Sequence, residues 1–363
     1  MQNTIAKRLK AAREQSGLTQ QQLSDQLGFK DRQTLAAIET GARKISADEL
    51  LAAMKALNRD LEYFTDPFRL EGEGTFTWRS SADAADRLAE FESQAGAWIA
   101  LYRHLGMRER TWTAPVRLDL TAKSTYEDAH RAAAWLGDEW ALGEIPAQTL
   151  EGAIRERLRA LVLYVDAPEG VSGAAFRLPE LSAILINRNE PVGRRNFDLA
   201  HELFHLLTWP TIRPAHSEDS GILQPKGRPE QLANCFASAL LMPENVIRRW
   251  WAQPAVADQS ARTRWLLESA RQFRVSAAAL QWRLVPLGML KKSDVDESRD
   301  LSPDLEAKGD RPRLFGLDFV TALRGGIEDG RISVRRASTL MGLTIDELAD
   351  LFGEYGLGVP FDI

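Results

Sequence analysis

Two histidines and a glutamate stand in the spacing H-E-x-x-H at residues 201–205. Residues four apart share one face of a helix, so His201 and His205 would present their imidazoles side by side, next to Glu202. Two neutral histidine nitrogens bind zinc, and a neighbouring carboxylate takes a proton from the water that the ion acidifies. The pentapeptide therefore predicts a catalytic zinc site with Glu202 as general base. The alternatives are a structural histidine pair on a buried helix and a metal site that does not cleave.

The sequence on both sides of the pentapeptide predicts the elements that would position it. Residues 181–187 form a short, apolar, β-branched run that ends in a polar residue, which predicts a strand. Residues 196–209 repeat apolar side chains at helical intervals, and Pro210 ends that pattern. The two histidines are therefore expected on a helix that follows a strand.

A catalytic zinc site has three protein ligands and keeps one position open for water. The next strong helical pattern covers residues 229–242, with a proline at its start and another directly after it. Glu230 stands at its beginning and can supply the third ligand. Asn234 follows one turn later and can hold a ligand histidine by its other ring nitrogen. Alternatively, Glu230 is a favourable acidic residue in a first helical turn, and Asn234 an ordinary helix-facing amide.

Several stretches of the chain resemble the ImmA/IrrE-type metallopeptidases in order and spacing, over about residues 123–290. These stretches are 171–173, 185–187, 196–205, 230–243 and 273–288. The resemblance implies a zinc peptidase that cleaves a transcriptional repressor and so relieves stress-response genes or genes of mobile elements. Two residues depart from the family pattern: Phe204 stands where a small residue is common, and Asp198 where Thr is common. Neither is a ligand, so these departures bear on the shape of the pocket and not on metal binding.

For two further residues near these motifs, the sequence points less specifically to a function. His216 lies in a polar loop, residues 213–219, where it would either stabilise an oxyanion or face solvent. Cys235 follows Asn234 on a helix with buried character, which predicts a packing role. It is the only cysteine of the chain, which excludes an internal disulfide framework and fits a reducing cytoplasm.

The first 68 residues predict a separate helical unit. Four short helices are expected at residues 5–13, 20–27, 31–40 and 46–57, with Thr19 and Ser46 as caps. Short helices joined by a tight glycine-containing turn give the helix-turn-helix geometry, whose second helix can enter the major groove. The order of residues resembles the Xre/Cro-like DNA-binding domains, which implies double-stranded operator DNA as a partner. The matching positions are Arg8, Leu9, Arg13, Leu23, 18–20, 27–28 and 38–41.

The charge of this unit is consistent with DNA binding. Residues 1–47 hold eight Lys or Arg and four Asp or Glu, within a chain of net charge −5, and a local basic excess favours phosphate contact. Gln20 or Gln21 would sit on a phosphate, and Gln33 would read an adenine edge. The residues predicted to contact DNA are Gln20, Gln21, Lys30, Arg32, Gln33 and Thr34. The alternative is a protein-binding module with the same fold.

The whole chain is expected to be mainly α with a small β-sheet, in the α+β class. Residues 69–122 would be a helical spacer with one long helix at 82–105, and residues 123–290 the metallopeptidase domain. A charged linker at 291–313 would lead to a small helical domain at 314–363, which resembles a motif of antitoxin-like proteins. No run approaches eighteen apolar residues, so no membrane partner is expected.

Together these features predict a cytoplasmic, homodimeric DNA-binding regulator with a zinc-dependent endopeptidase domain. Its substrate would be a protein, expected to be another repressor, in a stress-response, mobile-element or toxin–antitoxin system. A substrate segment would add as a β-strand to the strand at 181–187. One alternative is an antitoxin-like autoregulator that binds DNA and a partner toxin through a peptidase fold that does not cleave. Another is a scaffold that uses zinc only for stability.

Overall fold

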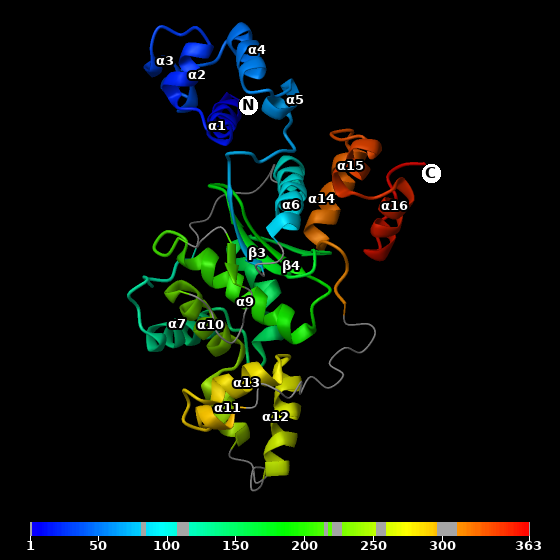
Figure 1. The fold of residues 1–363 in the computed structure, drawn as a ribbon. Coiled ribbons are helices and arrows are strands. Elements are labelled where there is room, and N and C mark those ends of the chain that lie inside the picture. Colours follow the sequence, from blue (N-terminus) through cyan, green and yellow to red (C-terminus); the bar gives the residue numbers. More distant parts are fainter. Residues whose placement is uncertain are drawn as a thin grey trace.

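The computed structural model describes residues 2–80, 85–106, 116–213, 217–219, 227–251, 259–295 and 311–362. Helices surround one small mixed sheet, and a helical unit stands at each end of the chain (Figure 1). The predicted class, mainly α with a small sheet, is confirmed. Within the described part of the chain, no helix combines the length and the apolar character that a membrane span requires.

The head, residues 2–68, packs five short helices around an apolar core of its own. These helices are α1 (Gln2–Gln15), α2 (Gln20–Gln26), α3 (Arg32–Glu39), α4 (Ala47–Ala56) and α5 (Leu61–Thr65). Thr19 and Ser46 cap α2 and α4 through reciprocal capping boxes, as predicted. Gly28 has a φ of +71° and lets the chain turn sharply between α2 and α3. The α2–α3 pair is the predicted helix-turn-helix.

The sheet has five strands in the order β2-β4-β3-β1-β5. The strands are β1 (Thr75–Ser80), β2 (Leu161–Val165), β3 (Val171–Arg177), β4 (Ser182–Asn187) and β5 (Ser217–Asp219). Strand β3 runs antiparallel to both of its neighbours, β1 and β4, whereas β2 is parallel to β4 and β5 is parallel to β1. Both edges of β4 are therefore occupied. The prediction that a substrate strand adds to residues 181–187 is wrong, because β2 and β3 already take the backbone hydrogen bonds of β4.

Alternate residues of the strands enter two different apolar cores, one on each face of the sheet. Ala175 and Ile184 face the core formed with the peptidase helices, while Ala174 and Leu185 face the opposite core. The first core contains residues of α7 (Tyr126–Glu139), α8 (Leu150–Ala153), α9 (Val192–Thr208), α10 (Arg228–Leu241), α11 (Glu244–Trp251), α12 (Gln259–Phe273) and α13 (Ala277–Leu284). The second core contains residues of α6 (Ala85–Gly106), α14 (Leu317–Glu328), α15 (Val334–Met341) and α16 (Ile345–Glu354).

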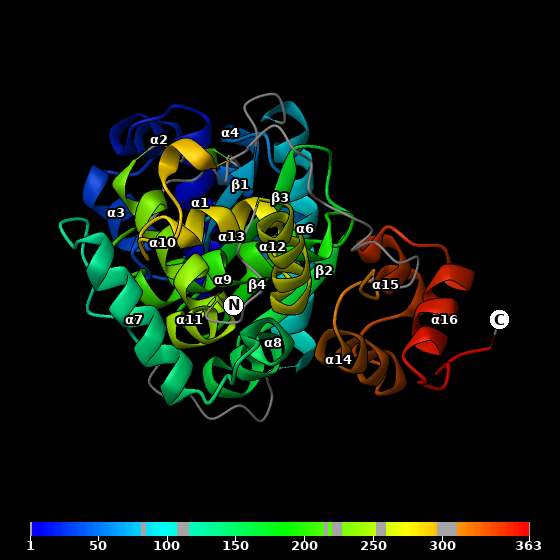
Figure 2. The ribbon, with the colours of Figure 1, turned by 90° about the horizontal axis from the view of Figure 1, so that it is seen from below.

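The C-terminal helices and the predicted spacer are integrated with the sheet. Figure 2 shows α14–α16 on the opposite side of α6 from α9 and α10. Phe315 forms a β-bridge with Tyr164 and is buried in the same core as α6. The segment 69–122, predicted as a helical spacer, contains α6 but also β1, so it is only partly helical. Most of the predicted linker, residues 296–310, lies outside the described residues.

A short strap, residues 69–74, joins the head to β1 and is held on both sides. A Cβ on Gly72 would lie 2.7 Å from the carbonyl oxygen of Lys7 in α1, and one on Gly74 would lie 2.2 Å from the ring of Phe176 in β3. The strap is thus in contact with the head on one side and with the sheet on the other. Only glycine fits at these two positions without displacing its neighbours.

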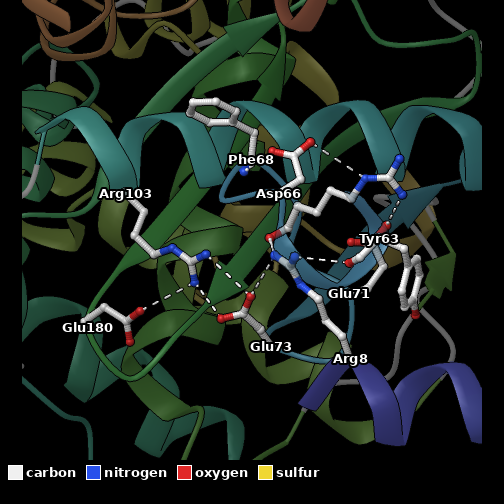
Figure 3. Close-up of polar contacts among 9 residues, drawn as sticks. Arg8, Tyr63, Asp66, Phe68, Glu71, Glu73, Arg103 and Glu180 are labelled. Carbon is white, nitrogen blue, oxygen red and sulfur yellow. Dashed lines mark hydrogen bonds and ion pairs between the residues drawn. The ribbon is translucent and has the colours of Figure 1, made fainter. Parts of the chain in front are cut away.

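Ion pairs reinforce the junction between head and sheet (Figure 3). Arg8, which is fully buried, donates to the carbonyl oxygens of Tyr63 and Arg69 and lies 3.3 Å from Oε1 of Glu73. Glu73 also binds Arg103 of α6 at 2.8 Å. The head is therefore fixed to α6 through one shared carboxylate of the strap.

Candidate metal centre

Helix α9 carries the H-E-x-x-H residues through the interior of the domain. It begins at Val192, directly after Pro191, and so starts earlier than the predicted residue 196. Nearly all of its residues are buried, because β3 and β4 cover one side of the helix and α10 another. The polar side chains of so buried a helix need their partners inside the protein.

His201, His205 and Glu230 meet where α9 faces α10, and one donor atom of each lies within 4.8 Å of the others. The two Nε2 atoms are 3.0 Å apart. Oε2 of Glu230 lies 3.1 Å from Nε2 of His201, and Oε1 lies 3.3 Å from Nε2 of His205. The structure thus brings together the three residues that the sequence predicts as ligands.

Asn234 lies next to this cluster, one turn after Glu230 on α10. Its Oδ1 is 2.8 Å from Nδ1 of His201. An amide oxygen only accepts, so Nδ1 of His201 carries the proton and its Nε2 presents a lone pair to the cluster. This is the predicted arrangement, in which a second residue orients a ligand histidine.

The protonation states of the cluster suit a divalent cation. Burial lowers the pKa of His201 to about 4, so its imidazole is neutral near pH 7. Burial by itself would raise the pKa of Glu230, but the two imidazoles outweigh it and hold that pKa below its ordinary range. Neutral imidazole nitrogens and an ionised carboxylate are the donors that zinc takes in two-His, one-Glu sites. In the described part of the chain the cluster has three such residues, so a metal ion bound there would keep one coordination position for water.

Glu202 lies beside the cluster but is not part of it. Its side chain is 1% exposed, and its Oε2 has no hydrogen-bond partner among the described residues. Burial raises the pKa of Glu202 well above its ordinary range, although the positive charge of Arg79 opposes this rise. The backbone amide of Ala175 in β3 also faces this carboxyl group. A buried carboxyl next to converging metal donors is the arrangement that a general base needs.

The predicted DNA-contacting residues lie around the start of α3. Lys30 precedes the helix, and Arg32 and Gln33 occupy its first turn; all three are exposed. Thr34 is half-buried, and its backbone amide and hydroxyl both bind the capping carboxylate of Asp31. The exposed side chains of Lys30, Arg32 and Gln33 can reach a DNA groove. Thr34 instead stabilises the first turn of α3 through its contacts with Asp31.

The two glutamines at the start of α2 are engaged within the head. Nε2 of Gln20 donates to Oε2 of Glu39 at 2.8 Å, and Nε2 of Gln21 donates to Oδ1 of Asp25 at 2.7 Å. Gln21 is exposed and Gln20 half-buried. The amide of Gln20 thus ties α2 to the end of α3.

Two parts of the chain match known sequence families. Residues 156–285 match the IrrE N-terminal-like domain, and residues 9–64 match the helix-turn-helix family. The chain joins a helix-turn-helix domain to an IrrE N-terminal-like domain. Both resemblances that the sequence predicts are thereby confirmed. No curated protein matches the chain.

A buried ion pair joins the IrrE N-terminal-like domain to a strand outside its matched range. Arg79 of β1 reaches Asp198 of α9, and the two form an ion pair of 2.7 Å beside the metal centre. Sequence reasoning did not find Arg79; the only signal was Asp198, an acidic residue where the family commonly has Thr. His216, which the sequence predicts either to stabilise an oxyanion or to face solvent, lies outside the described residues.

Proposed function

We propose that this chain is a DNA-binding transcriptional regulator whose IrrE N-terminal-like domain is a zinc-dependent endopeptidase. The observation that carries the proposal is the convergence of His201, His205 and Glu230 beside the buried Glu202. The helix-turn-helix domain supports operator DNA as one partner. A regulator that binds chromosomal DNA would work in the cytoplasm.

In this proposal His201, His205 and Glu230 hold the zinc ion, and Asn234 keeps His201 in the tautomer that binds it. The bound ion would lower the pKa of a water molecule and polarise the scissile carbonyl. Glu202 would take the proton from that water and pass it to the leaving amine. Burial raises the pKa of Glu202, and the positive charges of Arg79 and of a bound metal ion would both oppose that rise. The bound ion would therefore favour the ionised carboxylate that acts as the base.

The proposed substrate is a protein, namely a second repressor whose cleavage would release genes of a stress-response or mobile-element system. One observation favours a second candidate function. The three proposed ligands and Glu202 are all buried, so these side chains offer little surface to a substrate. The same burial suits an antitoxin-like autoregulator that binds DNA and a partner toxin without cleaving it.

The substitution Glu202→Gln separates these functions. Zinc-loaded protein is incubated with the purified product of the neighbouring gene, and fragments are identified by mass spectrometry. Glu202→Gln should keep its zinc and lose about 100- to 10,000-fold in cleavage rate, because only proton transfer is removed. Glu156→Gln, an exposed glutamate of the same domain, should cleave like the wild type. Stable binding of the repressor or a toxin by wild-type protein without cleavage would favour the second candidate.

A further inference from the structure

Asp198 is fully buried on α9, three residues before His201. Its Oδ1 accepts a hydrogen bond of 2.7 Å from the guanidinium of Arg79, and its Oδ2 lies 3.4 Å from Nε of Arg194. Arg194 belongs to the same helix, whereas Arg79 stands 119 residues earlier, on β1. Asp198 therefore joins the helix that carries the metal centre to a strand outside the matched domain.

Strand β1 places Arg79 next to the proposed base. Arg79 pairs with Gly173 of β3, and the register of this ladder shifts directly afterwards, between Arg79 and Ser80. Irregularities of this kind re-aim side chains and are frequent beside active sites. A Cβ on Gly173 would lie 3.8 Å from Cγ of Glu202. Arg79 thus stands one strand away from the residue that faces the Glu202 side chain.

Stability alone is a weak reason for this ion pair. Arg79 is 2% exposed and Asp198 is fully buried, so both charges have been removed from water. The cost of that removal is commonly as large as the attraction between the two charges. The positive charge of Arg79 acts to lower the pKa of both His201 and Glu202, and only burial has a larger effect on these two groups. The ion pair of Arg79 and Asp198 therefore lies close to the residues of the metal centre.

We propose that Arg79 is a positioning residue of the metal centre, a role that rests on the proposed zinc site. Through Asp198 it fixes the turn of α9 that carries His201 and Glu202. The ligand nitrogen of His201 and the carboxyl group of Glu202 then hold the same positions whether or not the ion is bound. Contacts that support metal ligands typically change metal affinity about 10- to 100-fold when they are removed.

The zinc affinity of the full-length chain, measured by competition with a coloured chelator, tests this role. Arg79→Met removes the charge, keeps much of the side-chain length, and should weaken zinc binding about 10- to 100-fold. Arg79→Lys keeps the charge and should restore a large part of the affinity. With cobalt(II) as the probe, the visible absorption spectrum of Arg79→Met should differ from that of the wild type, because a displaced ligand changes the coordination geometry.

Arg155→Met is the control for losing an arginine ion pair away from α9. It removes a partly exposed pair of the same 2.7 Å length, with Asp318, and it should leave affinity and spectrum unchanged. Asp198→Asn keeps the shape of the Asp198 side chain, removes its charge, and should also weaken zinc binding. This second variant tests the role if Arg79→Met does not fold. The positioning role alone would be overturned if Arg79→Met had wild-type zinc affinity and an unchanged spectrum. If Arg79→Met does not fold, the same result in Asp198→Asn would overturn it. A wild-type chain that binds no zinc would overturn the proposed function, and this role with it.

Discussion

Nδ1 of His201 donates a hydrogen bond of 2.8 Å to Oδ1 of Asn234, across the interface of α9 and α10. This contact holds the imidazole in one tautomer, with its lone pair on Nε2. That nitrogen is 3.0 Å from its counterpart in His205 and 3.1 Å from Glu230. Asn234 therefore determines which nitrogen of His201 is available to a metal.

Asn234→Ala should weaken zinc binding about 10- to 100-fold, because His201 loses the acceptor that orients its ring. The measurement is chelator competition with the full-length protein. Gln231→Ala is the control on the same helix: Oε1 of Gln231 accepts from Tyr126 and has no contact with the metal donors in the described structure. Equal zinc affinities of Asn234→Ala and the wild type would show that other contacts orient His201.

The ion pair of Arg13 and Glu39 holds the head together. Nε of Arg13 lies 2.6 Å from Oε1 of Glu39, both side chains are buried, and the pair joins α1 to the end of α3. Arg13→Met would leave the Glu39 carboxylate buried without its cation. We expect the local stability of α1–α3 to fall by about 3–5 kcal/mol, measured by native-state hydrogen exchange of their amides.

An exposed pair in the same head is the comparison for this prediction. Arg43 binds Glu49 at 2.7 Å, but the Arg43 side chain is 42% exposed. Water already solvates and screens that pair, so Arg43→Met should change amide exchange little. Similar losses in Arg13→Met and Arg43→Met would contradict the argument that burial makes the first pair important.

The first turn of α3 should contribute both affinity and sequence preference for DNA. Arg32→Ala should weaken binding to all duplexes and reduce the slope of log affinity against log salt by about 0.9, the value for one phosphate contact. Gln33→Ala should instead reduce discrimination at one base pair, by about 5- to 150-fold. Both are measured by fluorescence anisotropy with duplexes from the region upstream of the gene, at several salt concentrations.

Arg157→Ala is the control for charge, since Arg157 is an exposed cation of the IrrE N-terminal-like domain. It should leave the salt slope unchanged. If Arg32→Ala and Arg157→Ala give the same slope, α3 does not contact the phosphates, and the head is then better explained as a protein-binding module.

The metal centre could be predicted from the sequence because its pattern is local. The spacing of four residues puts His201 and His205 on one face of a helix whatever surrounds that helix. The same rule relates Glu230 to Asn234 on α10. Local spacing does not say which helices face each other. The choice of Glu230 rests on its place at the start of the next strong helical pattern, and the resemblance to a known family agrees with it.

The contact of Arg79 with Asp198 could not be predicted in this way. The two residues are 119 positions apart, and β1 has only six residues, so neither periodicity nor spacing marks their contact. The strand-addition prediction at residues 181–187 failed for a related reason. The order of strands in a sheet depends on pairing between distant segments, and here β3 lies between β4 and a strand from the predicted spacer.

His130 of α7 gives the last prediction, which concerns acid stability. Burial, and then the positive charge of Arg283, lowers the pKa of His130 to about 4, compared with about 6.5 in an unfolded chain. Between these two values the unfolded chain binds more protons than the folded protein. The free energy of unfolding should therefore decrease as the pH falls from about 6.5 to about 4, and His130 should contribute no further loss below that range.

His130→Gln removes this proton uptake and should make the decline of the thermal midpoint between pH 7 and pH 4.5 shallower than in the wild type. Some decline should remain, because burial lowers the pKa of His201 in the same direction. Each protein is compared with its own midpoint at pH 8, so that a change in packing at residue 130 does not affect the slope. Parallel curves for His130→Gln and the wild type would mean that His130 takes up its proton equally well in the folded protein, which its half-buried position beside Arg283 argues against.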